Sequence, residues 1–344
     1  MRFRFESLKG FHGWPQRWLK PATALSRSLR PIVTSWMHSK RRKIENAPRV
    51  SGEVPVVCVG NIVVGGSGKS PLVVSLALRL KEAGFRPGIV SRGYGGHAKN
   101  LPIEVTETSL PQNVGDEPLM LKKRTGCPVI VCRDRLKAVE RLLFHHPVNV
   151  VLSDDGLQNT LMWRDFSVCV FSKYQGIGNG LEMPFGPLRE PLSVLEEMDA
   201  IIVRGTEYPK EMLIEMGIET KTPVFGSIGE MAYAYRSDLP DEHYSISDLV
   251  HHGDFDAVSG IATPSRFFEG LEQVGLSIEK YAFPDHHAFT ASDVSGLNRV
   301  ITTEKDAVKL VHLLTKPFWV VGLQSRQPEF ESWLIDRLKE WRRV

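Results

Sequence analysis

The chain has 344 residues, 42% hydrophobic and 24% charged, which is the balance of a globular protein long enough for two modest domains. Its four cysteines stand apart without a C-x-x-C pair, a pattern that argues against zinc and favours reduced thiols. The net charge of +3 is uneven, because residues 1–49 carry twelve Lys or Arg and two Glu. The remainder is acidic, so we expect an anionic partner for this arm alone, either nucleic acid or anionic lipid.

The basic arm also carries an apolar stripe at helical spacing. Its members, three or four positions apart, are Phe11, Trp14, Trp18, Ala22, Leu25, Leu29, Ile32 and Trp36. Tryptophans with basic flanks are typical of the bilayer interface, so we expect a peripheral membrane segment and no nucleic acid. A helix packed on its own domain is the alternative. No run is long enough to span a bilayer, and we expect no cleaved signal peptide.

Apolar runs alternate with helical patterns from residue 54 onward. Strands are expected within 54–66, 86–96, 126–132, 148–156, 166–172 and 198–205, and helices at 69–85 and 133–146. This alternation predicts an α/β fold, namely a mostly parallel, P-loop NTPase-like sheet with helices on both faces. Ligands of such sheets bind at the carboxyl ends of the strands.

The pattern restarts near residue 225, with apolar runs in 255–275, 300–310 and 317–323 and a final amphipathic helix. We therefore predict three parts. They are a basic amphipathic membrane-associated segment (1–49), a P-loop core (50–225) and a smaller C-terminal α/β domain (226–344).

Residues 63–70 resemble a phosphate-binding loop that lacks its first glycine. The usual pattern is G-x-x-x-x-G-K-[ST], but its first position here is a valine. The remaining glycines still allow backbone N–H groups to face an anion at the start of a helix. The predicted nucleotide-binding residues are Val63, Val64, Gly65, Gly66, Ser67, Gly68, Lys69 and Ser70. Lys69 would reach the β- and γ-phosphates, and the Ser70 hydroxyl would bind Mg²⁺.

Three further motifs carry acidic or imidazole groups. Asp154 and Asp155 follow an apolar strand, where a Walker-B carboxylate would bind Mg²⁺; a solvated pair of loop carboxylates is the alternative. Asp116 lies in "GDEP", where it is either catalytic or an ordinary acidic residue at a helix N-terminus. His286 lies in "FPDHH" and by itself indicates only a possible metal ligand or proton relay.

Together these motifs resemble the tetraacyldisaccharide 4'-kinases, the lipid A 4'-kinases of Gram-negative bacteria. The resemblance spans residues 14 to 323 and rests on "VGNIVVGGSGKSP", "GIVSRGYGG", "GDEP", "LSDDGLQ", "GNG…PFGPLREPL", "VSGIATPSRFFEGL", "FPDHH" and "TTEKDAVKL". It implies transfer of the ATP γ-phosphate, with Mg²⁺, to the 4'-hydroxyl of a tetraacyldisaccharide 1-phosphate at the cytoplasmic face of the inner membrane. The product would be lipid IVA, and no obligate protein partner is implied.

The resemblance also implies residue roles. Asp116 would be the general base and His286 its dyad partner, with Lys69 as the third catalytic residue. Asp154 and Asp155, with Ser70, would hold the metal, or the two carboxylates would position its ligands. The implied substrate or active-site contacts are Arg92, Tyr94, Gln158, Arg189 and Glu190, of which Arg189 suits the 1-phosphate. The dyad requires the C-terminal domain to close over the substrate.

One departure from the family pattern concerns the acidic motif. The family usually has histidine after the glutamine of DDGxQ, whereas this chain has Asn159, which loses a possible proton donor but can keep a hydrogen bond. Two other functions remain open from the residues. One is a different P-loop transferase or synthetase, and the other is a membrane-associated P-loop ATPase that acts as a nucleotide switch.

Overall fold

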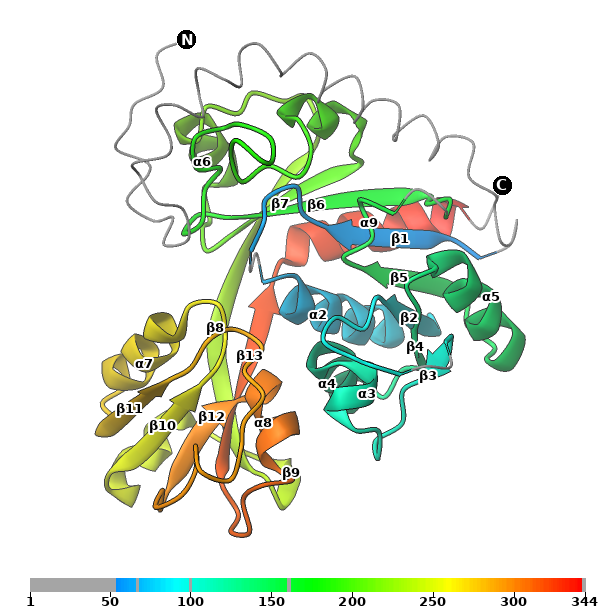
Figure 1. Cartoon of the computed structure of the whole chain (residues 1–344). Coiled ribbons are helices and arrows are strands. Elements are labelled where there is room, and N and C mark those ends of the chain that lie inside the picture. The colour runs from blue at the N-terminus through cyan, green and yellow to red at the C-terminus, as the bar shows by residue number, and fades with distance from the viewer. Residues whose placement is uncertain (1–53, 66–67, 99–100, 160–161, 342–344) are drawn as a thin grey trace. The chain divides into compact units, whose positions relative to one another are not determined.

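The computed structural model describes residues 54–65, 68–98, 101–159 and 162–341 (Figure 1). The predicted membrane segment and Gly66 and Ser67 of the loop lie outside these ranges. The described residues form two compact units. The first runs to Arg92 and also contains 127–228 and the chain from Arg326 onward; the second contains 93–126 and 229–325. Residues 93–126 thus group with the C-terminal unit, although the domain ranges drawn from the sequence stay a prediction.

The first unit is built on a parallel sheet with the order β8-β7-β6-β1-β5-β2-β4. Its strands are β1 (Val56–Gly60), β2 (Pro87–Ser91), β4 (Val129–Val131), β5 (Val150–Asp154), β6 (Phe166–Ser172), β7 (Ala200–Arg204) and the start of β8 (Val224–Arg236). Every residue of β1, β2, β4, β5 and β6 is buried. Strands this apolar need cover on both faces, as the sequence predicted.

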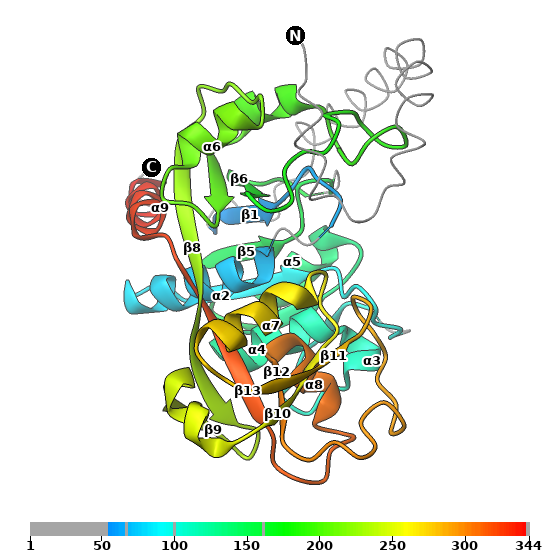
Figure 2. The same ribbon diagram turned by 90° about the vertical axis from the view of Figure 1, so that its left-hand side faces the viewer.

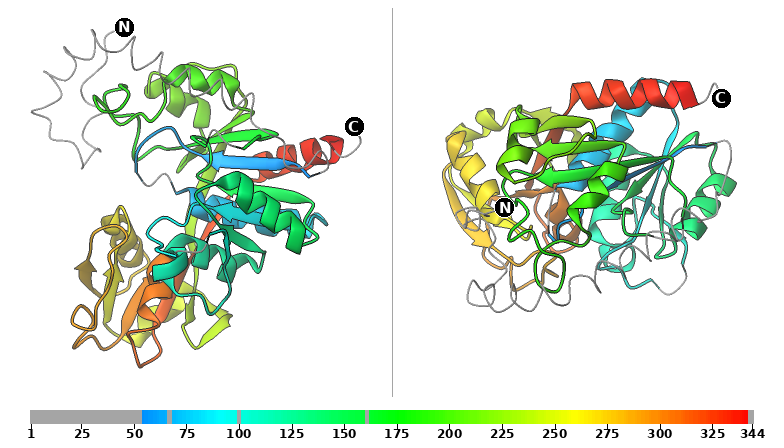
Figure 3. Two further views of the ribbon diagram at one scale, coloured as in Figure 1. Left: turned by 45° about the vertical axis from the view of Figure 1, so that its right-hand side comes forward. Right: turned by 90° about the horizontal axis from the view of Figure 1, so that it is seen from above.

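Helices provide that cover. They are α2 (Lys69–Glu82), α5 (Arg135–His145), the 3-10 helix η3 (Leu192–Glu197), α6 (Pro209–Glu215) and α9 (Pro328–Trp341). Helix α2 packs on the central strands and is contacted by α9, whereas α5 packs on β2 and β4 (Figure 3). Asp134 caps α5 by accepting hydrogen bonds from the N–H groups of Leu136 and Lys137.

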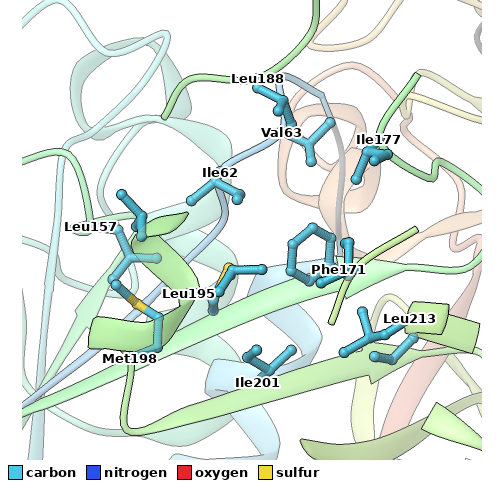
Figure 4. Packing of buried hydrophobic residues seen from close by; sticks show 14 of the residues in the cluster. Ile62, Val63, Leu157, Phe171, Ile177, Leu188, Leu195, Met198, Ile201 and Leu213 are labelled. Carbon is cyan, nitrogen blue, oxygen red and sulfur yellow. The ribbon is translucent and has the colours of Figure 1, made fainter. Parts of the chain in front are cut away.

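The core beside β1, β6 and β7 extends into the phosphate-loop segment. Val63 is 2% exposed and belongs to a buried cluster with Leu188 and Ile177 (Figure 4). The same cluster includes Phe171 of β6 and Ile201 of β7. The loop therefore begins with an apolar anchor in the core, at the position where the usual pattern has glycine.

In the second unit the strands follow the order β11-β10-β12-β13-β8, with β9 antiparallel to β8. Its elements are β3 (Ile103–Glu104), α3 (Pro111–Val114), α4 (Asp116–Thr125), β9 (Leu239–Tyr244), η4 (Ile246–His252), β10 (Phe255–Ser259), α7 (Pro264–Gln273), β11 (Ile278–Ala282), β12 (Val300–Thr303), α8 (Glu304–Leu310) and β13 (Trp319–Arg326). Strands β10, β11, β12 and β13 pair in parallel.

Neighbouring residues of β10 face opposite sides of the sheet. Ala257 packs in a cluster with Phe267 and Leu271 of α7, whereas Val258 packs in another with Leu310 of α8. The period of two along a strand places α7 and α8 on opposite faces (Figure 2). The α/β fold class is therefore confirmed for the described residues. Within those ranges, no helix is both long and apolar enough to cross a membrane.

Candidate active site

The phosphate loop follows β1, and the two acidic residues follow β5, which pairs with β1 in parallel so that Val59 lies opposite Asp154. Carboxyl ends of parallel strands meet at one edge of a sheet. The loop and the carboxylates therefore lie together, as the motif spacing predicted. Helix α2 begins at Lys69, directly after Gly68, which has a left-handed φ of 71°. A helix start of this kind presents free N–H groups and a positive dipole end to an anion.

Side-chain amides hold the loop from within. The Asn61 side chain is fully buried and donates a 2.6 Å hydrogen bond to the carbonyl of Val63. Gln175 donates from Nε2 to the carbonyl of Val64 at 2.5 Å. The backbone N–H of Val64 donates to Pro187 at 2.8 Å, and that of Arg189 donates to Ile62 at 2.6 Å. These contacts hold the backbone of residues 62–64, where the usual pattern has its first glycine.

Lys69 lies between two acceptors. Its Nζ is 3.2 Å from Oδ1 of Asn61 and 3.2 Å from Oδ1 of Asp155. Arg189 Nη1 lies 3.3 Å from both Asp155 oxygens and donates to Oε1 of Gln158 at 3.3 Å. Burial raises the pKa of Asp155, but Lys69 and Arg189 outweigh it, so the pKa lies below the ordinary carboxyl value. Asp155 is therefore an ionised carboxylate shared by two cations.

Asp154 is more deeply buried, with 2% of its surface exposed. Its Oδ2 accepts from the Ser91 hydroxyl at 3.4 Å, and its backbone carbonyl accepts from Arg135 at 3.1 Å. The Ser70 hydroxyl and the two carboxylates are hard oxygen donors, which suit Mg²⁺. Mg²⁺ is commonly bound through one or two carboxylates with the substrate's phosphates completing the shell, so this donor set fits a magnesium nucleotide.

In the second unit, Asp116 and His286 meet. Asp116 is the first residue of α4 and is buried, and both of its carboxylate oxygens lie 3.1 Å from Nδ1 of His286. Lys309 of α8 lies 3.8 Å from Asp116 Oδ2, and Lys305 lies 3.2 Å from Nε2 of His286. The exposed ring of Tyr94 lies 4.9 Å from the imidazole, measured between centroids.

Charges and hydrogen bonds in this cluster shift the pKa values of both Asp116 and His286. Burial raises the pKa of Asp116, but the hydrogen bond from His286 and the charges of Lys305 and Lys309 outweigh it and bring the pKa below the ordinary value. The hydrogen bond to Asp116 raises the pKa of His286, although burial and Lys305 act against it. Because the two groups are in direct contact, their titration belongs to the pair.

The structure therefore places the predicted residues in two groups. The first unit contains Arg92, Gln158, Arg189, Glu190 and the loop, and the second contains Asp116, Tyr94 and His286. Gln158 also donates to the carbonyl of Asn61 at 2.9 Å, and Arg92 is exposed. The roles of these side chains stay predictions.

Sequence reasoning missed several residues in these groups. They are Asn61, Gln175 and Arg204 near the loop, and Lys305 and Lys309 around the dyad. A side chain at Gly68 would collide with the Arg204 guanidinium, which places Arg204 directly against the loop. No local motif marks Gln175 or Arg204, whereas Lys305 and Lys309 stand in the quoted "TTEKDAVKL" and could have been noticed at the helical spacing of four.

A parallel sheet with a Gly-Lys-Ser loop at a helix N-terminus and carboxylates on the adjacent strand defines the class of P-loop nucleotide-binding proteins. Residues 16–339 match the family model of the tetraacyldisaccharide-1-P 4'-kinases, and the chain belongs to that family. It is 44% identical over 290 residues to the tetraacyldisaccharide 4'-kinase of Dechloromonas aromatica, covering 83% of this chain and 84% of that protein.

Two further relatives support the same family. The chain is 38% identical over 278 residues to the tetraacyldisaccharide 4'-kinase of Nitrosococcus oceani, covering 80% of this chain and 78% of that protein. It is also similar to the solved structure of the "apo" form of LpxK from Aquifex aeolicus in complex with ATP. That match has a TM-score of 0.74 at 26% identity and covers 92% of this chain and 99% of the other.

Proposed function

We propose that this protein transfers the γ-phosphate of ATP to the 4'-hydroxyl of a tetraacyldisaccharide 1-phosphate and so forms lipid IVA for lipopolysaccharide synthesis. The observation that carries the proposal is the loop at the start of α2, where Lys69 lies 3.2 Å from Asp155 on the edge of a parallel sheet. Membership of the tetraacyldisaccharide-1-P 4'-kinase family supports the choice of phosphate acceptor. The Aquifex relative in complex with ATP supports the choice of nucleotide.

In this proposal the loop N–H groups and Lys69 bind the β- and γ-phosphates. When ATP enters, the negative phosphates offer Lys69 a stronger partner than the single carboxylate of Asp155. Bound Mg²⁺ would neutralise charge that develops on the transferring phosphoryl group. Ser70 and Asp154 are proposed to hold that ion, and Asp155 either joins them or keeps Lys69 and Arg189 in position.

Asp116 is proposed to accept the proton of the 4'-hydroxyl. Its pKa lies below the ordinary carboxyl value, which makes it a weak base. A weak base suffices when the proton leaves late, because the attacking alcohol becomes strongly acidic as the new P–O bond forms. His286 holds the carboxylate through Nδ1 and spreads the charge of the pair. Lys69 and Asp116 belong to different units, so the proposal requires both units to meet the substrate.

The lipid substrate calls for further contacts. Arg189 is proposed to bind the substrate's 1-phosphate, with Arg92, Tyr94, Gln158 and Glu190 as additional contacts. Residues 1–49, with their apolar stripe and basic charge, are proposed to bind the cytoplasmic leaflet of the inner membrane. Deleting residues 1–40 should abolish cosedimentation with anionic vesicles. Full cosedimentation of the truncated protein would place the membrane contact elsewhere.

The decisive assay supplies the purified protein with Mg·ATP and the disaccharide 1-phosphate and identifies the product by mass spectrometry. We expect one added phosphoryl group at the 4'-position. The same lipid without its 4'-hydroxyl is the matched control and should remain unmodified. ATP hydrolysis at a rate that does not change when the lipid is added, and that rises only with a protein partner, would instead support the nucleotide switch.

A further inference from the structure

A lysine outside the predicted site completes the surroundings of His286. Lys305 is the second residue of α8, and its side chain is only 16% exposed. Its Nζ lies 3.2 Å from Nε2 of His286, 3.0 Å from Oδ1 of Asp285 and 3.3 Å from Oε1 of Glu117. The lysine therefore contacts both the dyad imidazole and two carboxylates that are not part of the dyad.

The ammonium group of Lys305 can only donate hydrogen bonds, and this determines which nitrogen of the His286 imidazole accepts and which donates. A lysine ammonium carries three N–H donors and no acceptor. The Lys305 ammonium, 3.2 Å from Nε2 of His286, can form a hydrogen bond there only when Nε2 accepts and therefore carries no proton. The remaining proton is then on Nδ1, which donates to Asp116 at 3.1 Å. An imidazolium would instead direct a second N–H at the ammonium group.

The surroundings keep Lys305 charged. Burial lowers the pKa of the Lys305 ammonium, but Glu117, Asp116 and Asp285 outweigh it, and the pKa lies above the ordinary lysine value. Asp285 is the other acid near the imidazole, with Oδ2 3.8 Å from Nε2, beyond hydrogen-bond distance. Within the described part of the chain, Lys305 is thus the donor that faces Nε2 at hydrogen-bond distance.

We propose that Lys305 is a positioning residue for the catalytic pair: it donates to Nε2 of His286, opposes protonation of the imidazole and keeps the proton of the neutral ring on Nδ1, facing Asp116. The proposal rests on the assignment of Asp116 and His286 as the acid–base pair of the proposed kinase. Without the lysine, Asp116 alone would favour imidazolium, and the carboxylate would be held in an ion pair that is poorer at accepting the substrate proton.

The groups that face the imidazole set the expected pH dependence. They are Asp116 of α4, Lys305 of α8, Asp285 in the same loop and the Tyr94 ring; Lys309 faces Asp116. Removing Lys305 takes away a positive charge that opposes protonation of the pair. The acidic limb of kcat/KM should therefore move upward by about one pH unit in Lys305→Met.

The kinetic test compares Lys305→Met and Lys305→Arg with the wild type between pH 5.5 and about 9. At pH values below the acidic limbs of both proteins, kcat/KM of Lys305→Met should be about tenfold lower than that of the wild type. Above both limbs, the variant should recover most of the wild-type kcat/KM. Lys305→Arg, which keeps the charge, should keep the limb near its wild-type position. Lys316→Met, at an exposed lysine of the same unit, is the matched control. A loss that is equal at every pH would mean that Lys305 is only structural.

A spectroscopic test stands apart from kinase activity. In ¹⁵N-histidine protein, the His286 signals are assigned by their absence in His286→Gln. Above the titration of the pair, the wild type should show neutral imidazole with its proton on Nδ1, and Lys305→Met should titrate at higher pH. A proton on Nε2 in the wild type would overturn the proposal, even if Lys305→Met failed to fold. If instead the wild type lacked 4'-kinase activity, the proposed function would fail while the tautomer result stood.

Discussion

The ion pair between Arg124 and Glu304 offers the sharpest test of how the second unit is held together. Arg124 lies in the last turn of α4, and Glu304 is the first residue of α8; their side chains are 15% and 7% exposed and in direct contact. Arg124 also donates to the carbonyl of Leu323 at 3.4 Å. Arg124→Met should therefore leave a carboxylate buried beside a neutral side chain.

Breaking a buried pair by removing one partner costs about 3–5 kcal/mol. For a unit of this size, such a loss should lower Tm by roughly 10 °C. Burial already raises the pKa of Glu304, and Arg124 opposes that rise. A raised folded-state pKa means that the carboxyl favours folding below its unfolded pKa and that this contribution is lost as pH rises through the folded value. The loss of unfolding free energy caused by Arg124→Met should therefore be larger at pH 8 than at pH 5.

Calorimetric unfolding at pH 5 and pH 8 measures both effects. Arg124→Met with Glu304→Leu should recover much of the loss, because no charge then remains buried. Arg337→Met removes an exposed pair with Glu340, 56% and 66% exposed, and should cost less than about 1 kcal/mol. A deficit in Arg124→Met that was as small as this control, or that did not change with pH, would refute the reasoning.

Three further outcomes are expected at the proposed site. Asp116→Asn should lower kcat by roughly 10²- to 10⁴-fold and leave the ATP Kd from calorimetry nearly unchanged; adding His286→Gln should cost much less than the product of the single losses. Lys69→Ala should lower turnover by about 10²-fold or more in the phosphate-transfer assay. Gly68→Ala places a side chain at a left-handed φ of 71° against Arg204, so ATP binding should weaken roughly tenfold in the same calorimetric titration.

The first unit was largely predictable because its signals are local. The apolar run before the loop became β1, and the helical pattern at 69–85 became α2, Lys69–Glu82, which ends before Gly84. The acidic pair was expected at a strand end and lies there, since β5 ends at Asp154. Each of these elements follows from a period or a terminating residue within a few positions of itself.

Contacts between distant segments were not predictable in this way. Helix α4 begins at Asp116 and is separated by 170 residues from His286, which its carboxylate contacts. Only the family resemblance linked the two. Strand β8 was also missed as a long element, because "VFGSIGEMAYAYR" mixes glycine and polar residues without clear alternation. Its pairing partners stabilise it, and a single sequence does not display them.

The backbone offers independent support for two of the predicted site residues. In the described ranges, Asp155 and His286 are the non-glycine residues with positive φ, at 49° and 59°. A left-handed conformation costs a non-glycine residue roughly 1 kcal/mol or more, and glycine would adopt it without this cost.

Each strained residue lies against groups that hold its side chain by charge. Asp155 contacts Lys69 and Arg189, and His286 contacts Asp116 and Lys305. Glycine at either position would remove the backbone strain. Strained backbone that is retained beside such charged partners is typical of functional sites. The backbone strain at Asp155 and His286 therefore supports the roles proposed for their side chains.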